Sequence, residues 1–257
     1  MSIMSKNMVE VEYSRPLARV FINRPQVLNA YNEEVLDGLR ETFADLLEDD
    51  DVEAVIFTGR GSKSFSVGAD LNWLEKLDSG AAREISRKGQ SLCDMLEKSS
   101  KVIIAAINGY ALGGGMEFCL ACDLRIASTR ARLGQPEVSL GIVPGFGGTH
   151  RLPKLIGLGQ AKEILYTGNI IDAEEADEIG LVNELVTPRD LLKKSEELAR
   201  DITDQSARAV GLIKEIINRQ VDSDTSSHFE TRAFGLCFED DEHLERIKEL
   251  KKIIHKE

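Results

Sequence analysis

The stretch VIIAAINGYALGGGMEFCLACDLRIAS, residues 102–128, decides the fold class of this chain. Its first part, residues 102–108, is an apolar run rich in β-branched residues, which predicts a buried strand. Residues 108–117 form a glycine-bearing turn, and the apolar run at 124–128 predicts another strand. Buried strands joined by such connections are typical of an α/β protein with largely parallel pairing.

The residues before this stretch repeat the alternation of strands and helices. Apolar runs at 17–23 and 52–59 predict strands. Between them, apolar side chains recur at helical spacing after Asn32, whose residue type is favoured as a helix N-cap. A second amphipathic helix is predicted over residues 82–96. We therefore expect the N-terminal half to form one α/β unit.

The pattern changes after about residue 145. Helices are predicted over 159–166, 172–180, 189–201, 206–220 and 228–254, with a further strand at 182–186. We expect residues 1–200 to form the α/β core that carries the functional site. Residues 201–257 are expected to form a helical region that takes part in oligomerisation.

The composition limits the classes of function. A chain of 257 residues with 42% hydrophobic and 30% charged residues resembles an ordinary soluble globular protein. Its net charge of −12 argues against non-specific nucleic-acid binding, which needs a broad cationic surface. No apolar run approaches the ~20 residues of a membrane-spanning helix. Four cysteines are too few for a disulfide scaffold, so we expect a cytoplasmic protein without membrane partners.

Three glycine-bearing turns are the first candidates for a site. They cover residues 64–70, residues 108–117, and residues 134–137, the last leading into 141–148. Glycines that open a helix let a ligand approach backbone N–H groups that have no partner within the helix. Such groups can form an oxyanion hole where negative charge develops. The same glycines could instead serve tight packing of a helix on a strand, so they do not by themselves name a reaction.

Two carboxylates lie beside these turns. Glu117 directly follows the triple glycine, and Glu137 lies between a proline and an apolar run. A pair of acids near backbone donors suits general acid and base catalysis on a substrate held by its carbonyl group. The alternative is that each is a solvated surface residue, as most of the 44 acidic residues must be.

Two other features, a pair of cysteines and a histidine, are interpreted as structural and not as functional. Cys119 and Cys122 form a C-x-x-C, but no second Cys/His pair accompanies them, so buried free cysteines are preferred to a zinc or redox site. His150 lies near the third turn and is interpreted as a helix residue. The GFGGTH sequence is not the G-x-G-x-x-G of a dinucleotide site.

Three blocks of this sequence resemble the signatures of the enoyl-CoA hydratase/isomerase (crotonase) family. They are FSVGADL at 65–71, GYALGGGMEFCLACDLRIAS at 109–128 and LGQPEVSLGIVPGFGGTHRLP at 133–153. The resemblance extends over roughly residues 10–220. It implies a crotonase-like spiral of ββα units with a helical C-terminal region, and an acyl-CoA thioester as substrate. It also implies no metal or cofactor besides the coenzyme A of the substrate, and homotrimers or hexamers made of two trimers.

The resemblance also implies a role for particular residues. The backbone N–H groups of Ala69 and Gly114 would hold the thioester oxygen. Glu117 would orient and deprotonate a water for attack at C3, and Glu137 would deliver a proton to C2. The backbone of Gly145 would help to hold that water.

The coenzyme A portion is implied to lie along the first turn. The channel residues implied by the family are Val27, Leu28, Ser66, Val67, Gly68, Asp70 and Leu71, with Ala69 among them. Trp73 follows this turn and is expected to shape the acyl pocket. Arg24 and the C-terminal lysines are the candidates for holding the phosphates.

The presence of both acids favours a hydratase of short- or medium-chain 2-enoyl-CoA, which reversibly forms 3-hydroxyacyl-CoA. One alternative is a Δ3,Δ2-enoyl-CoA isomerase, because a single acid can shuttle a proton. GADLNWL also resembles hydratases of branched substrates such as methylglutaconyl-CoA. A non-catalytic acyl-CoA-binding or RNA-binding relative is the alternative outside enzymes, and the acidic charge and intact acid pair argue against it. The charged tail after Phe234 departs from the family pattern, in the region that the family uses for trimer contacts and for covering coenzyme A.

Overall fold

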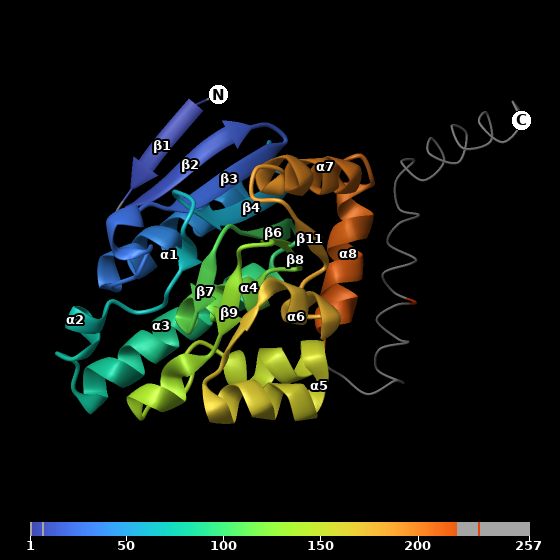
Figure 1. Ribbon diagram of the computed structural model, residues 1–257. Coiled ribbons are helices and arrows are strands. Elements are labelled where there is room, and N and C mark those ends of the chain that lie inside the picture. Colours follow the sequence, from blue (N-terminus) through green and yellow to red (C-terminus); the bar gives the residue numbers. More distant parts are fainter. Residues whose placement is uncertain (1, 7, 220–230, 232–257) are drawn as a thin grey trace, which may run out of the picture.

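The computed structural model describes residues 2–6, 8–219 and 231 (Figure 1). These residues form a seven-stranded sheet of order β1-β2-β3-β4-β6-β8-β11 and a four-stranded sheet of order β10-β9-β7-β5. Helices cover both faces of the longer sheet (Figure 1).

The longer sheet contains the strands that the apolar runs predicted. Its members are β1 (Ser2–Lys6), β2 (Val9–Ser14), β3 (Leu17–Ile22), β4 (Ala54–Gly59), β6 (Val102–Ile107), β8 (Leu124–Ser128) and β11 (Glu184–Val186). From β3 to β11 all neighbours are parallel, as expected, whereas β1, β2 and β3 form an antiparallel meander.

Strand β2 was not predicted, although its sequence carries a signal. Val9 and Val11 are buried and alternate with Glu10 and Glu12. This two-residue alternation is that of a strand with one face on the core. The charged face is satisfied by ion pairs, among them those of both glutamates with Arg60.

The second sheet consists of four strands of three residues each, and none of them was predicted. They are β5 (Ser64–Ser66), β7 (Tyr110–Leu112), β9 (Arg132–Gly134) and β10 (Ile170–Asp172). β5, β7 and β9 each follow a long strand of the first sheet and precede a helical segment. This repeat of long strand, short strand and helix is the spiral of ββα units that the resemblance implied, so the predicted fold class is confirmed.

The helices predicted within the described residues are present with shifted ends, although the one expected over 159–166 begins at residue 148 and the short helix over 71–74 was not predicted. The helices are α1 (Glu33–Glu48), α2 (Leu71–Leu74), α3 (Ser79–Lys98), α4 (Gly114–Ala121), α5 (Gly148–Thr167), α6 (Ala173–Glu178), α7 (Leu191–Thr203) and α8 (Ala207–Asn218), with 3₁₀ turns η1 (Pro25–Val27) and η2 (Pro136–Leu140). The side chain of Asn32 caps α1, as predicted, by accepting from the Val35 N–H at 3.1 Å. The helix expected over 228–254 lies outside the described residues.

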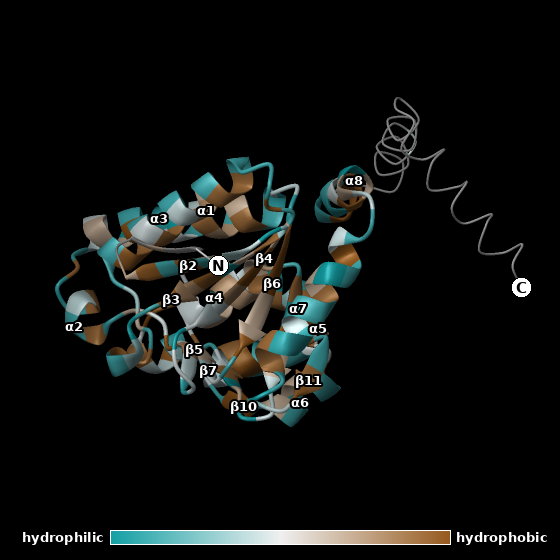
Figure 2. Ribbon diagram, turned by 90° about the horizontal axis from the view of Figure 1, so that it is seen from above, coloured by the Kyte–Doolittle hydropathy of each residue, from teal (hydrophilic) through white to brown (hydrophobic). Residues whose placement is uncertain are grey.

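The core is divided by the long sheet because successive strand residues point to opposite faces. Val55 and Phe57 of β4 join the cluster that includes α1, α3 and α4, whereas Ala54 and Ile56 pack toward α7. Figure 2 shows α1 and α3 along one side of the strands and α7 along the other. No helix among the described residues is both long and apolar enough to cross a membrane.

Helix α8 is joined to the body of the protein by a buried lysine. The ammonium of Lys214 donates to the Leu96 and Lys101 carbonyl oxygens at 3.0 and 2.9 Å, to Ser99 Oγ at 3.0 Å, and to Asp123 Oδ2 at 2.7 Å. Two of these acceptors belong to the C-terminal end of α3 or its cap, where carbonyl groups lack helical partners.

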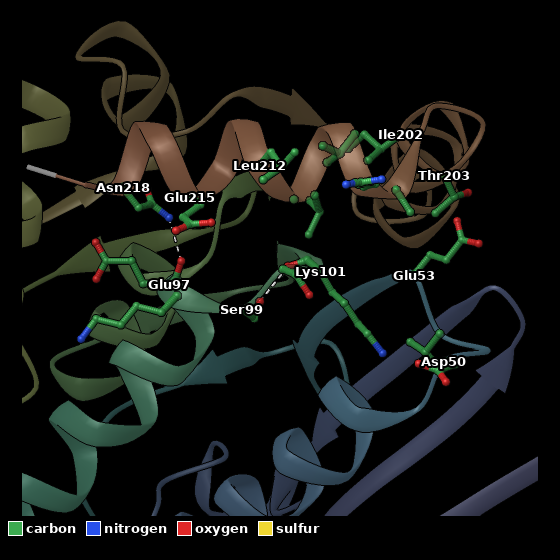
Figure 3. Close-up of a pocket in the computed structure, with 18 of the residues that line it drawn as sticks. Asp50, Glu53, Glu97, Ser99, Lys101, Ile202, Thr203, Leu212, Glu215 and Asn218 are labelled. Carbon is green, nitrogen blue, oxygen red and sulfur yellow. Dashed lines mark hydrogen bonds between the residues drawn. The ribbon is translucent and has the colours of Figure 1, made fainter. Parts of the chain in front are cut away.

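A pocket of about 770 Å³ lies between α8, the end of α3 and residues 50–53 (Figure 3). The Asn218 amide closes one end of it by donating to the Glu97 carbonyl oxygen at 2.7 Å. None of the residues implied in catalysis lines this pocket. It is therefore separate from the candidate active site.

The buried ammonium group of Lys214 predicts how a substitution at this position changes the stability of the protein. Replacing Lys214 by Met is expected to lower the free energy of unfolding by about 3 kcal/mol, because the largely buried carboxylate of Asp123 would lose its cation and keep the Ile103 N–H as a donor. Lys193→Met is the control: its ion pair with Glu197 is exposed, so we expect a change within about 0.5 kcal/mol. Urea unfolding of both variants measures the difference, and equal small losses would contradict a buried ionic anchor.

Candidate active site

The first glycine turn is held by the backbone of Tyr31. The Tyr31 N–H donates to the Gly68 carbonyl oxygen at 2.9 Å, and the Asp70 N–H donates to the Tyr31 carbonyl oxygen at 2.8 Å. The Gly68 carbonyl and the Ala69 N–H belong to the same trans peptide, so they point in opposite directions. The Ala69 N–H is therefore directed away from Tyr31 N, and it donates to no other described residue.

The second glycine turn touches the first. A methyl group added to Gly68, whose φ is +90°, would lie 3.0 Å from the Leu112 carbonyl oxygen and 3.5 Å from Gly114 N. Gly114 begins α4, so its N–H belongs to the first turn, which has no helical acceptor. Like Ala69, Gly114 donates to no other described residue through its N–H. Two N–H groups without an acceptor among the described residues thus lie on adjoining turns.

Glu117 lies in α4, one turn after these glycines, and only 1% of it is exposed. Its Oε1 accepts from the N–H groups of Phe146 and Gly148, both at 2.7 Å. Burial raises the pKa of Glu117, while the backbone hydrogen bonds of Gly148, Phe146 and Gly145 act against that rise by favouring the charged form. Since both hydrogen bonds reach Oε1, Oε2 is the oxygen left for a substrate or a water.

Glu137 lies in η2 and is 8% exposed. Gln135 holds it: with the amide oriented to suit both partners, its nitrogen donates to Oε1 and Oε2 at 3.0 and 3.1 Å. A methyl group on Gly113 would lie 3.1 Å from Glu137 Oε1, so the carboxylate faces the triple glycine. Burial, with the nearby charge of Glu117, raises the pKa of Glu137 to about 7.

Gly145, expected to help hold a water, is fixed by α3. Its carbonyl oxygen accepts from Ser86 Oγ at 2.7 Å and from Gln90 Nε2 at 3.0 Å. The next residue, Phe146, donates to Glu117. Helix α3 therefore helps to position the loop that surrounds the Glu117 carboxylate.

The predicted channel residues lie on two loops that touch. The Val67 N–H donates to the Leu28 carbonyl oxygen at 3.3 Å, and the Ser66 hydroxyl accepts from the Gly68 N–H at 3.2 Å. Val27 and Leu71 are exposed, at 38% and 61%, whereas Ser66 and Gly68 are buried. The two loops therefore combine exposed residues with buried ones, as a channel that leads from the surface into the protein requires.

Arg24 and Asp70 have structural partners. The Arg24 guanidinium donates to the Ala30 carbonyl oxygen at 2.7 Å and pairs with Asp70 at 3.3 Å. Asp70 also caps α2 by accepting from the Asn72 N–H at 3.1 Å. These contacts make Arg24 a poor candidate for holding phosphates. The C-terminal lysines lie outside the described residues.

Sequence reasoning missed three residues that shape this region. Asn29 is fully buried, and its amide donates to the carbonyl oxygens of Arg60 and Ser64 at 3.0 and 2.9 Å, which ties the two channel loops together. Gln135 is the hydrogen-bond partner of Glu137, and its place two residues before that acid was the available signal. Tyr31 contacts Trp73, Phe118 and Phe146 through its ring, and nothing in its local sequence indicated this.

The structure tests the interpretations given to the two cysteines and to His150. Cys119 and Cys122 are free and buried, as predicted. His150 is an exposed residue of α5, as predicted. Within the described part of the chain, no group of three or more His, Cys, Asp or Glu residues could hold a metal ion.

The fold and the site define an α/β protein of ββα spirals in which two buried acids lie beside unpaired backbone donors. The chain belongs to the enoyl-CoA hydratase/isomerase family, whose sequence pattern matches residues 12–252.

Named relatives and solved structures agree with this family. The chain is 45% identical to a crotonyl-CoA hydratase of Syntrophomonas wolfei, over 89% of this chain and 88% of that protein. It is 46% identical to a short-chain-enoyl-CoA hydratase of Clostridium acetobutylicum, over 91% of each. The crystal structure of an enoyl-CoA hydratase from Bacillus anthracis superposes with a TM-score of 0.93 at 38% identity, over 95% of this chain and 96% of that one.

Proposed function

We propose that this protein is a hydro-lyase that adds water across the 2,3 double bond of short-chain 2-enoyl-CoA thioesters, giving 3-hydroxyacyl-CoA. The observation that carries the proposal is a pair of buried carboxylates, Glu117 and Glu137, on either side of the triple glycine and its unpaired N–H groups. The names of the relatives from Syntrophomonas wolfei and Clostridium acetobutylicum support a short acyl chain.

The reaction would begin with polarisation of the thioester. The N–H groups of Ala69 and Gly114 would donate to the carbonyl oxygen, drawing electron density from C3 and stabilising the enolate-like transition state. Each such donor is worth on the order of 100- to 1,000-fold in rate in other enzymes. Because these donors are fixed by the backbone of Tyr31 and by the start of α4, they need no reorganisation during the reaction.

The two acids would then move protons in opposite directions. Glu117 would take a proton from the water as its oxygen forms a bond to C3, and Glu137 would give a proton to C2 as the double bond is lost. The environments support these roles. Burial raises the pKa of both acids, but three backbone hydrogen bonds oppose the rise at Glu117, whereas the pKa of Glu137 rises to about 7 and keeps much of it protonated at neutral pH.

The test is hydration of crotonyl-CoA by the purified protein, followed through loss of the conjugated enoyl absorbance. We expect rapid turnover, and much slower conversion of a 3-enoyl-CoA to its 2-enoyl isomer. Turnover of the 3-enoyl-CoA without hydration would replace this proposal by the isomerase. Binding of acyl-CoA without either reaction would replace it by a non-catalytic function.

The acid pair predicts the pH dependence. The active form carries one proton on the pair, so kcat/KM should fall above about pH 7, by about tenfold per pH unit, as the proton of Glu137 is lost. The reaction neither releases nor consumes a proton, so dehydration of 3-hydroxybutyryl-CoA must show the same alkaline fall. Initial rates in both directions measure it, and a rate that stays flat into the alkaline range would contradict the assignment of Glu137.

We also infer a homotrimer, or a hexamer of two trimers, in which residues 201–257 take part. Exposed apolar side chains on η2 and α5 support an interface, because such residues in one region indicate a contact surface. They are Val138, Leu140, Leu158 and Tyr166. Light scattering on the purified chain would measure the mass, and a monomer would contradict the inference.

A further inference from the structure

Tyr31 is a buried residue whose hydroxyl group makes no hydrogen bond within the described part of the chain. The residue is 6% exposed, and its ring lies against Phe146 and Phe118, with centroid distances of 5.3 and 5.7 Å, and edge-on to Trp73 at 6.3 Å. Its hydroxyl oxygen is not among the fully enclosed polar atoms that lack a partner, so it keeps some access to the space around it. A tyrosine hydroxyl in such a place ordinarily has a hydrogen-bond partner, and a molecule bound in the site can supply one.

The hydroxyl lies against the second glycine turn. A methyl group added to Gly114 would overlap the Tyr31 hydroxyl oxygen before any other atom. The hydroxyl therefore adjoins the residue whose N–H is proposed to hold the thioester oxygen. The backbone of the same tyrosine holds the Gly68–Ala69 peptide that carries the other proposed donor.

The burial and the charges around Tyr31 determine whether its hydroxyl is neutral or ionised. Burial, and then the negative charges of Glu117 and Glu137, raise the pKa of Tyr31 well above its usual value. The group therefore stays neutral and can donate a hydrogen bond. Such a neutral donor can stabilise an oxygen on which negative charge develops during the reaction.

We propose that the Tyr31 hydroxyl donates to the thioester oxygen as a third donor beside the N–H groups of Ala69 and Gly114. The inference rests on the proposed function, since it assigns the hydroxyl to the same substrate oxygen. It goes beyond the two backbone donors that the resemblance implied. The aromatic wall formed by Trp73, Phe118 and Phe146 fixes the ring, so the hydroxyl is already directed at the site before substrate binds.

The test is Tyr31→Phe, which keeps the ring, its packing and both backbone hydrogen bonds while removing the hydroxyl. We expect kcat for crotonyl-CoA to fall by about 100-fold, in the range for loss of one oxyanion donor, with little change in KM. Tyr13→Phe is the matched control because that hydroxyl lies on β2, where it donates to Met4 Sδ at 3.8 Å, and its activity should equal that of the wild type.

A spectroscopic measurement separates the thioester oxygen from other partners. A CoA thioester of an aryl-conjugated enoic acid absorbs at longer wavelength when its carbonyl is polarised, so binding to the wild type should shift its band to the red. The shift should be smaller in Tyr31→Phe. Full activity in this variant would overturn the proposal, and so would lost activity with an unchanged band shift, because the hydroxyl would then act on the water or an acid.

The measurements on Tyr31→Phe can be told apart from the test of the proposed function. If the wild type fails to hydrate crotonyl-CoA, the proposed function fails. The band shift still reports whether Tyr31 polarises a bound thioester, because that measurement needs binding and no turnover.

Discussion

Glu117→Gln is expected to lower kcat for hydration of crotonyl-CoA by about 1,000-fold or more, within the range for loss of a general base. An amide cannot accept the proton of the attacking water. The amide oxygen can still accept from the Phe146 and Gly148 N–H groups, so the loop around the site should keep its place. Acyl-CoA binding should therefore persist, and calorimetric titration with a saturated acyl-CoA measures it beside the rate.

Stability gives an independent check on this variant. Burial raises the folded-state pKa of Glu117 above its unfolded value, so its ionised form costs stability once the pH exceeds the unfolded pKa. At neutral pH, Glu117→Gln should therefore unfold at the same temperature as the wild type or a higher one. Glu163→Gln, at an exposed position on α5, is the control, with unchanged activity. A Glu117→Gln protein that is inactive because it has unfolded would leave the proton-transfer role without support.

The two acids should act as a unit. Glu137→Gln is expected to be nearly as inactive as Glu117→Gln, and the double variant should lose far less than the product of the single losses. The reason is that the water needs its proton removed in the same event in which C2 receives one. Losses that multiply in the double variant would indicate that the two acids act separately and not in one event.

The sequence predicted those features whose pattern lies within a short stretch of the chain. The long strands were predicted because runs such as 54–59 and 102–107 are apolar at almost every position, as strands buried on both faces require. Glu117 and Glu137 became candidates because each lies beside a glycine turn in the chain. The resemblance then connected them with the N–H groups of Ala69 and Gly114.

What the sequence could not predict depends on contacts between distant residues. The donors to Glu117 come from residues 29 and 31 positions later, and Tyr31 meets Gly114 across two turns. Strands of three residues such as β5 and β7 have too few positions to show a period. Their pairing comes from the fold, since the parallel register of β4 and β6 brings the turns that follow them side by side.

The contact between these turns predicts the second large effect. In Gly115→Ala, the new methyl group would overlap the Ser66 carbonyl oxygen, which belongs to the backbone of β5 and cannot rotate away. The start of α4 must therefore shift away from the first turn, and the N–H groups of Ala69 and Gly114 would no longer converge on one oxygen. We expect kcat to fall by at least about 100-fold, as when one donor is lost, with a lower unfolding temperature.

Gly159→Ala is the matched control for this variant. Gly159 lies in α5 just after Gly157, whose φ of +78° interrupts the helix, and a methyl group at Gly159 would meet no atom within 4 Å. Because the added methyl group meets nothing, this variant should be as active as the wild type and should unfold at a similar temperature. Crotonyl-CoA rates and thermal unfolding of both variants make the comparison. If Gly115→Ala lost stability but kept its rate, the donors would not depend on close contact of the two turns. The triple glycine would then serve packing alone, which is the alternative that the sequence left open.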